Sequence, residues 1–272
     1  MDKGNIPVFL VEGETLSETW EKSVLKTWYE GIQIRTEYDK PQDPPSKDCT
    51  MIMVCKYPFK EPRIHRSFPG GLDSLEIYKQ EVIQGIHDSW IKPEEGKWTY
   101  TYHERIFTYK IEGKIIDQID YIINKLSKVP YSRRAQAITW NVLKDPPTND
   151  PPCLQRIWFR IFEVENGKLV LNMNTHWRSR DAYKAAYMNI FALTELQKLV
   201  AEKISKNVNK EIIVGRYVDM TDSFHIYGSY YNEFKGFLET IGKRTFEERT
   251  WTTEFAKEIF DETAKKIKEG KI

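Results

Sequence analysis

Cysteine is scarce in this sequence of 272 residues, and the three that occur are Cys49, Cys55 and Cys153. They are too few and too scattered for a disulfide framework, and no CxxC spacing indicates a zinc site. The sequence also lacks a run of the roughly 18 apolar residues that span a bilayer, and its first ten residues lack the length and flanking charge of a signal peptide. We therefore expect a reduced, cytoplasmic protein with no metal and no membrane partner.

An excess of charge of one sign is also absent, because 41 Lys and Arg stand against 40 Asp and Glu, for a net charge of +1. This balance argues against a general binder of nucleic acid or of membrane surfaces, whose affinity depends on surplus basic side chains. It does not exclude one concentrated basic pocket. Aromatic residues make up 13% of the chain and must mostly be buried, which excludes intrinsic disorder.

The chain shows no internal repeat and no linker, so we expect one domain over residues 1–272. The stretch 36–47 carries three prolines and is expected to be a loop. The segment 182–204 is apolar on most sides, which predicts a buried central helix. Apolar spacing predicts helices at 17–29, 72–87, 115–126, 182–204 and 250–268, and strands at 51–55, 135–142, 157–164, 169–175 and 212–220. This pattern indicates an α+β fold with a mixed, mainly antiparallel sheet packed on the long central helix.

A candidate nucleophile is Cys153, which follows Pro151 and Pro152 and directly precedes a predicted strand. A rigid extended segment would position the thiol, and a nearby cation would lower its pKa and produce the thiolate. A single cysteine at a strand edge is, however, more often a small buried apolar residue.

Two basic clusters favour the interpretation of Cys153 as a nucleophile over that of a buried apolar residue. Arg133 and Arg134 precede one predicted strand, and Arg178, Ser179 and Asp181 follow another. Arginine is the preferred residue for binding a phosphate, since its planar guanidinium donates two hydrogen bonds and stays charged. Taken singly, each cluster would more often be a solvated loop.

A third feature is the segment 222–227, in which strand alternation places His225 and Tyr227 on one face. Both side chains could hydrogen-bond a sugar hydroxyl. Such a pair is also common in the interior of a protein.

The chain resembles thymidylate synthase in five motifs that occur in the family's order: SRRAQAITWN, PPC before a strand, a GKL hairpin, RSRDAYKAAYMNI and a strand ending in HIY. The resemblance covers about residues 131–234. It implies the thymidylate synthase fold and an obligate homodimer. It also implies conversion of dUMP to dTMP, with 5,10-methylene-tetrahydrofolate as the donor of the one-carbon unit and of hydride.

The resemblance implies a role for each matching residue. Cys153 would add to C6 of the uracil ring, and Arg178 would bind the phosphate and lower the pKa of the thiol. Arg133 and Arg134 would complete the phosphate site of the partner subunit. The other implied roles are phosphate binding by Ser179 and Arg35, pairing with O4 and N3 of uracil by Asn189, ordering of the pterin and of water by Asp181, and binding of the 3′-hydroxyl by His225 and Tyr227.

Three further roles fall in the less similar region before residue 131. Glu81 is the better match, and Glu76 the alternative, for a glutamate that moves a proton at O4 through water; both are equally well solvated helix carboxylates. Tyr102 matches the tyrosine associated with proton abstraction from C5. Trp90 matches a tryptophan that closes over the folate.

The sequence departs from the family mainly where the pterin would lie. Leu154 replaces the usual histidine after the nucleophile, and Trp177 replaces the glutamine before Arg178. The C-terminal residues 265–272 have no obvious counterpart of the segment that covers the cofactor. These differences resemble a divergent archaeal branch and leave open whether the pterin is tetrahydrofolate or a methanopterin-type analogue.

Two alternatives remain beside a thymidylate synthase. A pyrimidine-nucleotide 5-hydroxymethylase of the same superfamily would capture the exocyclic methylene with water instead of hydride. Asn189 favours uracil over cytosine, which would prefer an aspartate there, but does not separate the two reactions. The other alternative is a non-catalytic nucleotide- or RNA-binding relative, for which no basic stripe with interleaved aromatic residues provides support.

Overall fold

The computed structural model describes residues 4–272, and a seven-stranded sheet lies at their centre. The strand order is β1-β3-β10-β9-β8-β7, and β2 pairs with β3. The bounds are β1 Val8–Gly13, β2 Ile32–Ile34, β3 Ser46–Cys55, β7 Gln136–Ile138, β8 Leu154–Glu163, β9 Leu169–Asp181 and β10 Ile212–Ile226. Among these described strands, β1 with β3 and β9 with β10 are parallel, and the other pairings are antiparallel. The prediction of a mixed, mainly antiparallel sheet is confirmed.

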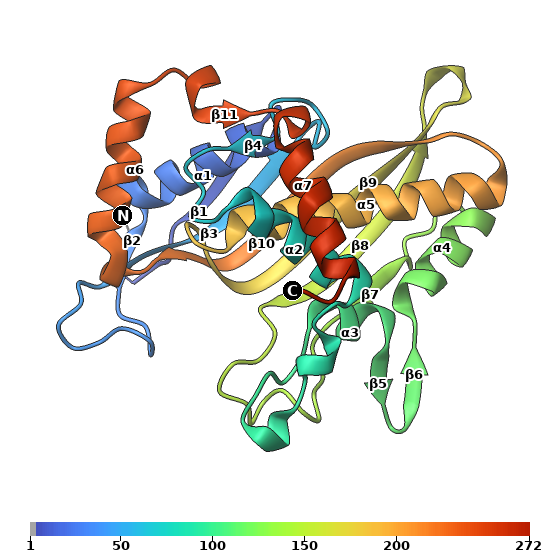
Figure 1. The fold of residues 1–272 in the computed structure, drawn as a ribbon, viewed down its shortest axis with the longest axis horizontal. Helices are drawn as coiled ribbons and strands as arrows, with labels where there is room; N and C mark the ends of the chain where they lie inside the picture. The colour runs from blue at the N-terminus through green and yellow to red at the C-terminus, as the bar shows by residue number, and fades with distance from the viewer. Residues whose placement is uncertain (1–3) are drawn as a thin grey trace.

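Helices pack mainly against one face of this sheet. Their bounds are α1 Leu16–Glu30, α2 Leu72–Gln84, α3 Tyr102–Phe107, α4 Gln118–Lys128, α5 Ala186–Val208, α6 Tyr231–Lys243 and α7 Thr253–Lys268. The long helix α5 contacts β9, β10, α1, α2 and α4, and α2 and α7 cross in front of it (Figure 1). Thirteen of its residues are buried, which confirms the predicted central helix and the α+β class.

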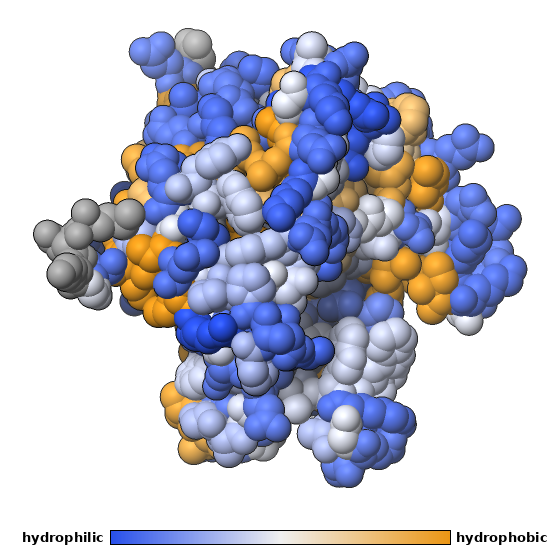
Figure 2. All heavy atoms as spheres, turned by 90° about the vertical axis from the view of Figure 1, so that its left-hand side faces the viewer, coloured by the Kyte–Doolittle hydropathy of each residue, from blue (hydrophilic) through white to orange (hydrophobic). Residues whose placement is uncertain are grey.

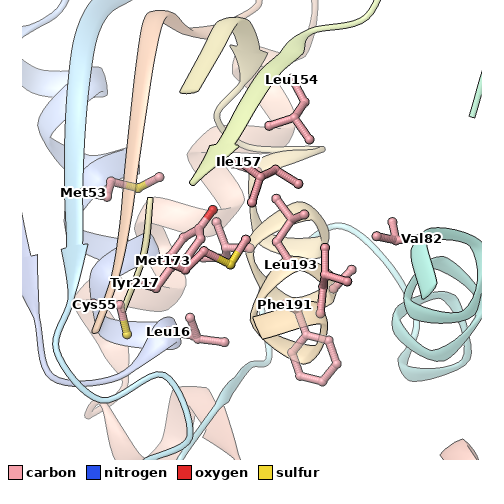
Figure 3. Close-up of a cluster of buried hydrophobic side chains, with 14 of the residues drawn as sticks. Leu16, Met53, Cys55, Val82, Leu154, Ile157, Met173, Phe191, Leu193 and Tyr217 are labelled. Atoms are coloured by element: carbon pink, nitrogen blue, oxygen red, sulfur yellow. The ribbon is translucent and has the colours of Figure 1, made fainter. Parts of the chain in front are cut away.

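Apolar side chains alternate along the strands, and those on the helix-covered face make the core. Met51, Met53 and Cys55 of β3 point to this face and are at most 1% exposed. Figure 3 shows Met53, Cys55 and Tyr217 from the sheet beside Leu16 of α1 and Phe191 of α5. The core therefore joins segments from the first, middle and last parts of the chain.

The opposite face of the sheet is only partly buried. The alternate residues Ile52 and Val54 of β3 and Val218 and Met220 of β10 are partly exposed, and Phe162 at the end of β8 is 48% exposed. Elsewhere on the surface, apolar patches also lie between larger hydrophilic areas (Figure 2). This face of the sheet also carries the partly exposed polar side chains of Asn174, His176 and Arg216, so its surface is mixed.

Two predicted elements differ from the structure because a strand pairing replaces helical geometry. Residues Lys114–Ile116 form β6, which pairs with β5, Tyr109–Ile111, across a turn where Glu112 and Gly113 have positive φ. The predicted helix 115–126 therefore begins only at α4, after the Asp117 N-cap. Likewise, Thr250–Trp251 form β11, which pairs with β4, Ile64–His65, before α7 begins.

Other differences concern the ends of strands. β9 continues to Asp181 and β10 to Ile226. The two strands pair in parallel up to these ends, where Asp181 is the register partner of His225. The prediction that Arg178 and Asp181 follow a strand is wrong, since both belong to β9. Only residues Gln136–Ile138 of the predicted strand 135–142 pair with β8. The helix predicted to begin at 182 begins at Ala186, since the turn after β9 uses the first four residues.

Within residues 4–272, no helix is long and apolar enough to cross a membrane. In the same part of the chain, no group of three or more His, Cys, Asp and Glu side chains is placed to hold a metal ion.

Candidate active site

A cavity of about 520 Å³ lies where the last residues of β9 and β10 meet the first turn of α5 and the segment before β8. It brings together most of the residues that the sequence predicts for the site. Its lining is Tyr38, Tyr102, Asn149, Asp150, Cys153, Trp177, Arg178, Ser179, Arg180, Asp181, Ala185, Asn189, His225 and Tyr227. Arg35, Arg133, Arg134, Glu81 and Trp90 are not part of this lining.

Cys153 lines this cavity and lies directly before β8, which begins at Leu154. Its side chain is partly exposed, and Sγ lies 3.6 Å from Ser179 Oγ. Burial raises the pKa of Cys49 and of Cys55 to about 12, and both thiols are enclosed in the core. Of the three cysteines, Cys153 is therefore the one that a substrate can reach.

Arg178 holds the segment that carries Cys153. Its backbone N–H donates to the Cys153 carbonyl at 2.9 Å, and its guanidinium donates to the carbonyls of Pro152 and Pro151 at 3.1 and 2.6 Å. A third guanidinium contact, at 3.3 Å, is to Ser179 Oγ. A guanidinium has five N–H donors, so it can make these contacts and still bind an anion in the cavity.

Asn189 lies in the first turn of α5, is 7% exposed and lines the cavity. Its Nδ2 donates to the hydroxyl of Tyr78 on α2 at 2.6 Å. Tyr78 was not among the predicted site residues, because nothing in the sequence separates it from the other fourteen tyrosines. Only the packing of α2 against α5 reveals this contact.

The two glutamates of α2 point to different places. Glu76 accepts hydrogen bonds from Gln80 and Lys79 and lines a groove between α2, α5 and α7. Glu81 lines a second hollow next to the Cys153 cavity, and its carboxylate lies 2.8 Å from His87 Nδ1. Burial raises the pKa of Glu81, and the His87 contact opposes that rise. Glu81 is thus nearer the site than Glu76, although Tyr78 is the α2 residue that contacts Asn189.

His225 and Tyr227 close another side of the cavity, with ring centroids 4.5 Å apart. His225 Nδ1 lies 3.2 Å from the Ser223 carbonyl, and Ser223 Oγ donates to Asp48 at 2.7 Å. In the described part of the chain, the buried Nε2 of His225 has no hydrogen-bond partner. This atom and the Tyr227 hydroxyl can therefore serve a hydroxyl group of a ligand. The supporting residues Asp48 and Ser223 were not predicted as site residues.

Asp181 is the last residue of β9 and orders the turn that leads into α5. One carboxylate oxygen accepts from the N–H groups of Tyr183 and Lys184 at 2.9 and 2.8 Å, and the other accepts from the Tyr230 hydroxyl. Burial raises the pKa of Asp181, and these hydrogen bonds oppose that rise. Its contacts show a structural task in addition to its place in the cavity lining.

Tyr102 begins α3 and belongs to both hollows. Its hydroxyl accepts from the backbone N–H of Leu154 at 3.3 Å, directly beyond Cys153. Burial raises the pKa of Tyr102 and of its neighbour Tyr100 well above the ordinary value. Both phenols therefore stay protonated at neutral pH.

A buried ion pair that was not predicted from the sequence adjoins the cavity, and one of its members, Arg180, is part of the cavity lining. Arg180 and Asp219 are at most 2% exposed, and the guanidinium of Arg180 makes two contacts with the carboxylate. The same carboxylate accepts from Trp177 Nε1 at 3.0 Å. A paired and hydrogen-bonded charge of this kind is tolerated in a core, whereas removal of one partner is strongly destabilising.

The remaining predicted residues lie outside the cavity. Arg35 is exposed and donates to the Lys40 carbonyl at 3.2 Å, in the loop that also carries Tyr38. Arg133 and Arg134 are exposed before β7. Trp90 is 46% exposed, and its ring lies 5.2 Å from that of Trp98.

The family model of thymidylate synthase matches residues 71–268, so the chain belongs to the thymidylate synthase family. A protein of Methanocaldococcus jannaschii named "Putative thymidylate synthase" is 29% identical over 224 residues, which are 80% of this chain and 90% of the relative. A protein of the same name from Methanosarcina mazei is 30% identical over 190 residues, 67% of this chain and 79% of the relative.

A solved structure has the same fold. The thermostable thymidylate synthase A of Bacillus subtilis superposes with a TM-score of 0.57, at 18% identity, over 81% of this chain and 83% of that chain. The resemblance that the sequence motifs indicated is confirmed in both family and fold.

Proposed function

We propose that this protein converts dUMP to dTMP with a reduced pterin as the donor of the one-carbon unit. The observation that carries the proposal is the meeting of Cys153, Arg178, Asn189 and His225 in one cavity. The reachable thiol suits attack on C6 of dUMP, and the cation suits the phosphate. The amide suits the edge of the base, and the free imidazole nitrogen suits the sugar hydroxyl.

The residues would divide the work as follows. Arg178 and Ser179 bind the phosphate, and Arg35 remains a candidate for the same task. His225 and Tyr227 bind the 3′-hydroxyl. Asn189 donates from Nδ2 to O4 and accepts the N3–H at Oδ1. Binding at three points would place C6 next to the thiolate. The nucleotide then loses its orientational freedom when it binds, so this entropy loss does not add to the barrier of the reaction.

Cys153 would then act as a covalent catalyst. Its thiolate forms a bond to C6, and the electrons of the C5–C6 double bond move toward C5 and O4. Hydrogen-bond donors at O4 stabilise the developing negative charge. Tyr102, which stays neutral, would hold the water that receives the C5 proton. Asp181 would fix the turn at the pterin side of the cavity.

The second hollow fits the reduced pterin. Its volume is about 420 Å³, and it shares Tyr102 and Asp150 with the Cys153 cavity. Trp98 and Tyr100 offer aromatic faces for stacking, and Trp90 lies beside Trp98. When bound, methylene-tetrahydrofolate or a methanopterin-type analogue supplies the one-carbon unit and, for a methyl product, the hydride.

The proposal includes a homodimer whose subunits share their sites. The partly exposed sheet face around Ile52, Val54 and Met220 would pack against the same face of a second copy. Arg133 and Arg134, which lie outside their own subunit's cavity, would then reach the phosphate in the partner's cavity. The proposed place of action is the cytoplasm.

The test is release of tritium from dUMP labelled at C5, followed by the mass of the product. The unmodified chain should release tritium and form dTMP, and C153A should do neither. C55A removes a thiol outside the cavity and is the matched control, which should keep the activity. A hydroxymethyl product would establish the hydroxymethylase alternative, and release by C153A would refute the covalent role of Cys153.

A further inference from the structure

The hydrogen bond between Asn189 and Tyr78 links the Cys153 cavity to the second hollow. Asn189 lines the first space, whereas Tyr78 lines the second, together with Glu81, Tyr100 and Tyr102. The bond is 2.6 Å long and joins α5 to α2. Tyr78 therefore stands in the wall between the two spaces, and its hydroxyl lies at the Nδ2 end of the Asn189 amide.

The orientation of this amide decides which base it can recognise. Uracil presents a donor at N3 and an acceptor at O4, and cytosine presents an acceptor at N3 and a donor at N4. A half-turn of the Asn189 amide exchanges Oδ1 and Nδ2, so that the same side chain would then pair with cytosine. A residue that holds the amide in one orientation therefore determines the base.

Tyr78 has a reason to accept a hydrogen bond from Asn189 instead of donating one. Glu81 lies three residues later on α2, on the same side of the helix, and lines the same hollow. Burial raises the pKa of Tyr78 well above its ordinary value, and the nearby Tyr102 and Glu81 raise it further. The phenol thus keeps its proton, and because Asn189 Nδ2 can only donate, the phenol oxygen is the acceptor in their contact. The lone pairs of the phenol oxygen are left to face Asn189.

We propose that Tyr78 is a positioning residue that holds the Asn189 amide in the orientation selecting uracil over cytosine. Nδ2 of Asn189 carries two N–H groups. When one of them pairs with O4 of uracil, the other points past O4, toward the Tyr78 oxygen. Tyr78 therefore acts from the O4 side of the base. As part of this proposal, the Glu81 carboxylate, which lines the same hollow, would direct the phenol proton away from Asn189. The inference rests on the proposed function, since it assumes that a pyrimidine nucleotide occupies the Cys153 cavity.

The experiment compares the affinities of dUMP and dCMP by titration calorimetry in the full-length protein, with no pterin and no turnover. The two nucleotides share their sugar and phosphate, so a general disturbance of the cavity weakens both equally and leaves their ratio unchanged. In the unmodified protein we expect dUMP to bind more tightly. In Tyr78→Phe we expect the ratio to fall by about tenfold, the equivalent of one hydrogen bond. In Glu81→Gln, whose amide can also donate, we expect a smaller fall in the same direction.

Tyr109→Phe is the matched control, because Tyr109 is a buried tyrosine outside both hollows whose hydroxyl donates to the Trp140 carbonyl. Its dUMP to dCMP ratio should equal that of the unmodified protein. An unchanged ratio in Tyr78→Phe with both nucleotides bound would overturn the inference and leave the proposed function intact. If Tyr78→Phe lacks a cooperative thermal transition, an unchanged ratio in Glu81→Gln would overturn it. If the unmodified protein binds neither nucleotide, the proposed function fails and this inference fails with it.

Discussion

Nε of Arg178 donates a hydrogen bond to the carbonyl oxygen of Pro152, the residue before Cys153, over 3.1 Å. The same guanidinium holds the Pro151 carbonyl, so the cation fixes the backbone on which the thiol is mounted. Because Arg178 has this structural task as well as the proposed binding of the phosphate, its replacement is expected to affect both. The ligand must therefore be varied together with the side chain.

Replacement of Arg178 by Ala should weaken binding of dUMP by about 10- to 100-fold, because hydrogen bonds to a charged group contribute about 1.5–3 kcal/mol. Deoxyuridine lacks the phosphate, so its affinity should change much less. Titration calorimetry with both ligands measures the difference. Arg66→Ala, at an exposed site away from the cavity, is the control. Equal loss for both ligands would show that Arg178 acts only through the Pro151 and Pro152 segment.

Cys153 should be the thiol that iodoacetamide modifies in the native protein. Cys49 and Cys55 are at most 1% exposed, and burial raises their pKa to about 12, so few of these thiols are ionised at pH 8. Mass spectrometry should find one label per native chain at Cys153 and three labels after denaturation. Excess dUMP should slow the native reaction. Rapid native labelling of Cys49 or Cys55 would contradict the packing described for β3.

Shared sites can be tested by mixing two inactive variants. Cys153→Ala lacks the nucleophile, and the double replacement of Arg133 and Arg134 by Glu would lack the basic groups that serve the partner. In a mixed dimer, one cavity has both an intact Cys153 and intact arginines from its partner. Random mixing should therefore restore about one quarter of the activity, because half of the dimers are mixed and each has one complete site of two. No recovery despite subunit exchange, measured by mass spectrometry, would refute the shared site.

The proposed dimer would pack through the partly exposed sheet face. A glutamate in place of Ile52 or Met220 would place like charges on both copies of a self-complementary surface. We expect a shift from dimer to monomer in analytical ultracentrifugation, with little change in far-ultraviolet circular dichroism. Ile115→Glu, on the exposed hairpin of β5 and β6, is the control and should remain dimeric. A dimer of unchanged stability in Met220→Glu would place the interface elsewhere.

A buried cluster of Glu21, His65 and Arg249 should make stability depend on pH. Burial lowers the pKa of His65 below its ordinary 6.5, and Glu21 at 2.8 Å does not fully offset this. The folded state therefore resists protonation of His65, while the unfolded chain accepts the proton. Stability that is present above pH 6.5 is lost as the pH falls, by at most about 1.4 kcal/mol per pH unit.

His65→Gln removes the titration of His65 and leaves that of Glu21. The pKa of Glu21 is lowered, so Glu21 affects stability at more acidic pH than His65 does. Glu21 is held in its charged form by His65 and by Arg249, which together outweigh the effect of burial. We expect the difference in unfolding free energy between the unmodified protein and His65→Gln to shrink from pH 7 to pH 5. Urea titrations at several pH values measure it. A difference that grows toward acid pH would mean that His65 is protonated in the folded state.

Local patterns in the sequence were sufficient for several features of the fold and the site. The apolar run at 182–204 predicts the central helix, because a helix with apolar residues on most sides can only be stable inside. The prolines before Cys153 predict a rigid approach to β8. The family motifs led to Cys153, Arg178, Asn189 and His225, and the structure brings these four side chains to one cavity.

Features that depend on distant pairing could not be predicted in this way. The end of β9 at Asp181 follows from its register with β10, and the short hairpin at Lys114–Ile116 follows from its partner strand. Apolar spacing over a few residues is compatible with either a helix or a strand, so the choice is made by the neighbour that supplies the hydrogen bonds.

The sequence by itself determined the scarcity of reactive thiols, the balanced charge, and the order of residues that identifies the family. Only the tertiary structure decided which α2 side chain meets Asn189. Glu76, Tyr78 and Glu81 lie within two turns of one helix. Glu76 lines the α7 groove, Tyr78 and Glu81 line the second hollow, and Tyr78 is the one of the three that contacts Asn189. The physical reason is that the rotation of α2 about its own axis is set by packing against α5 and α7, a relation between residues more than a hundred positions apart.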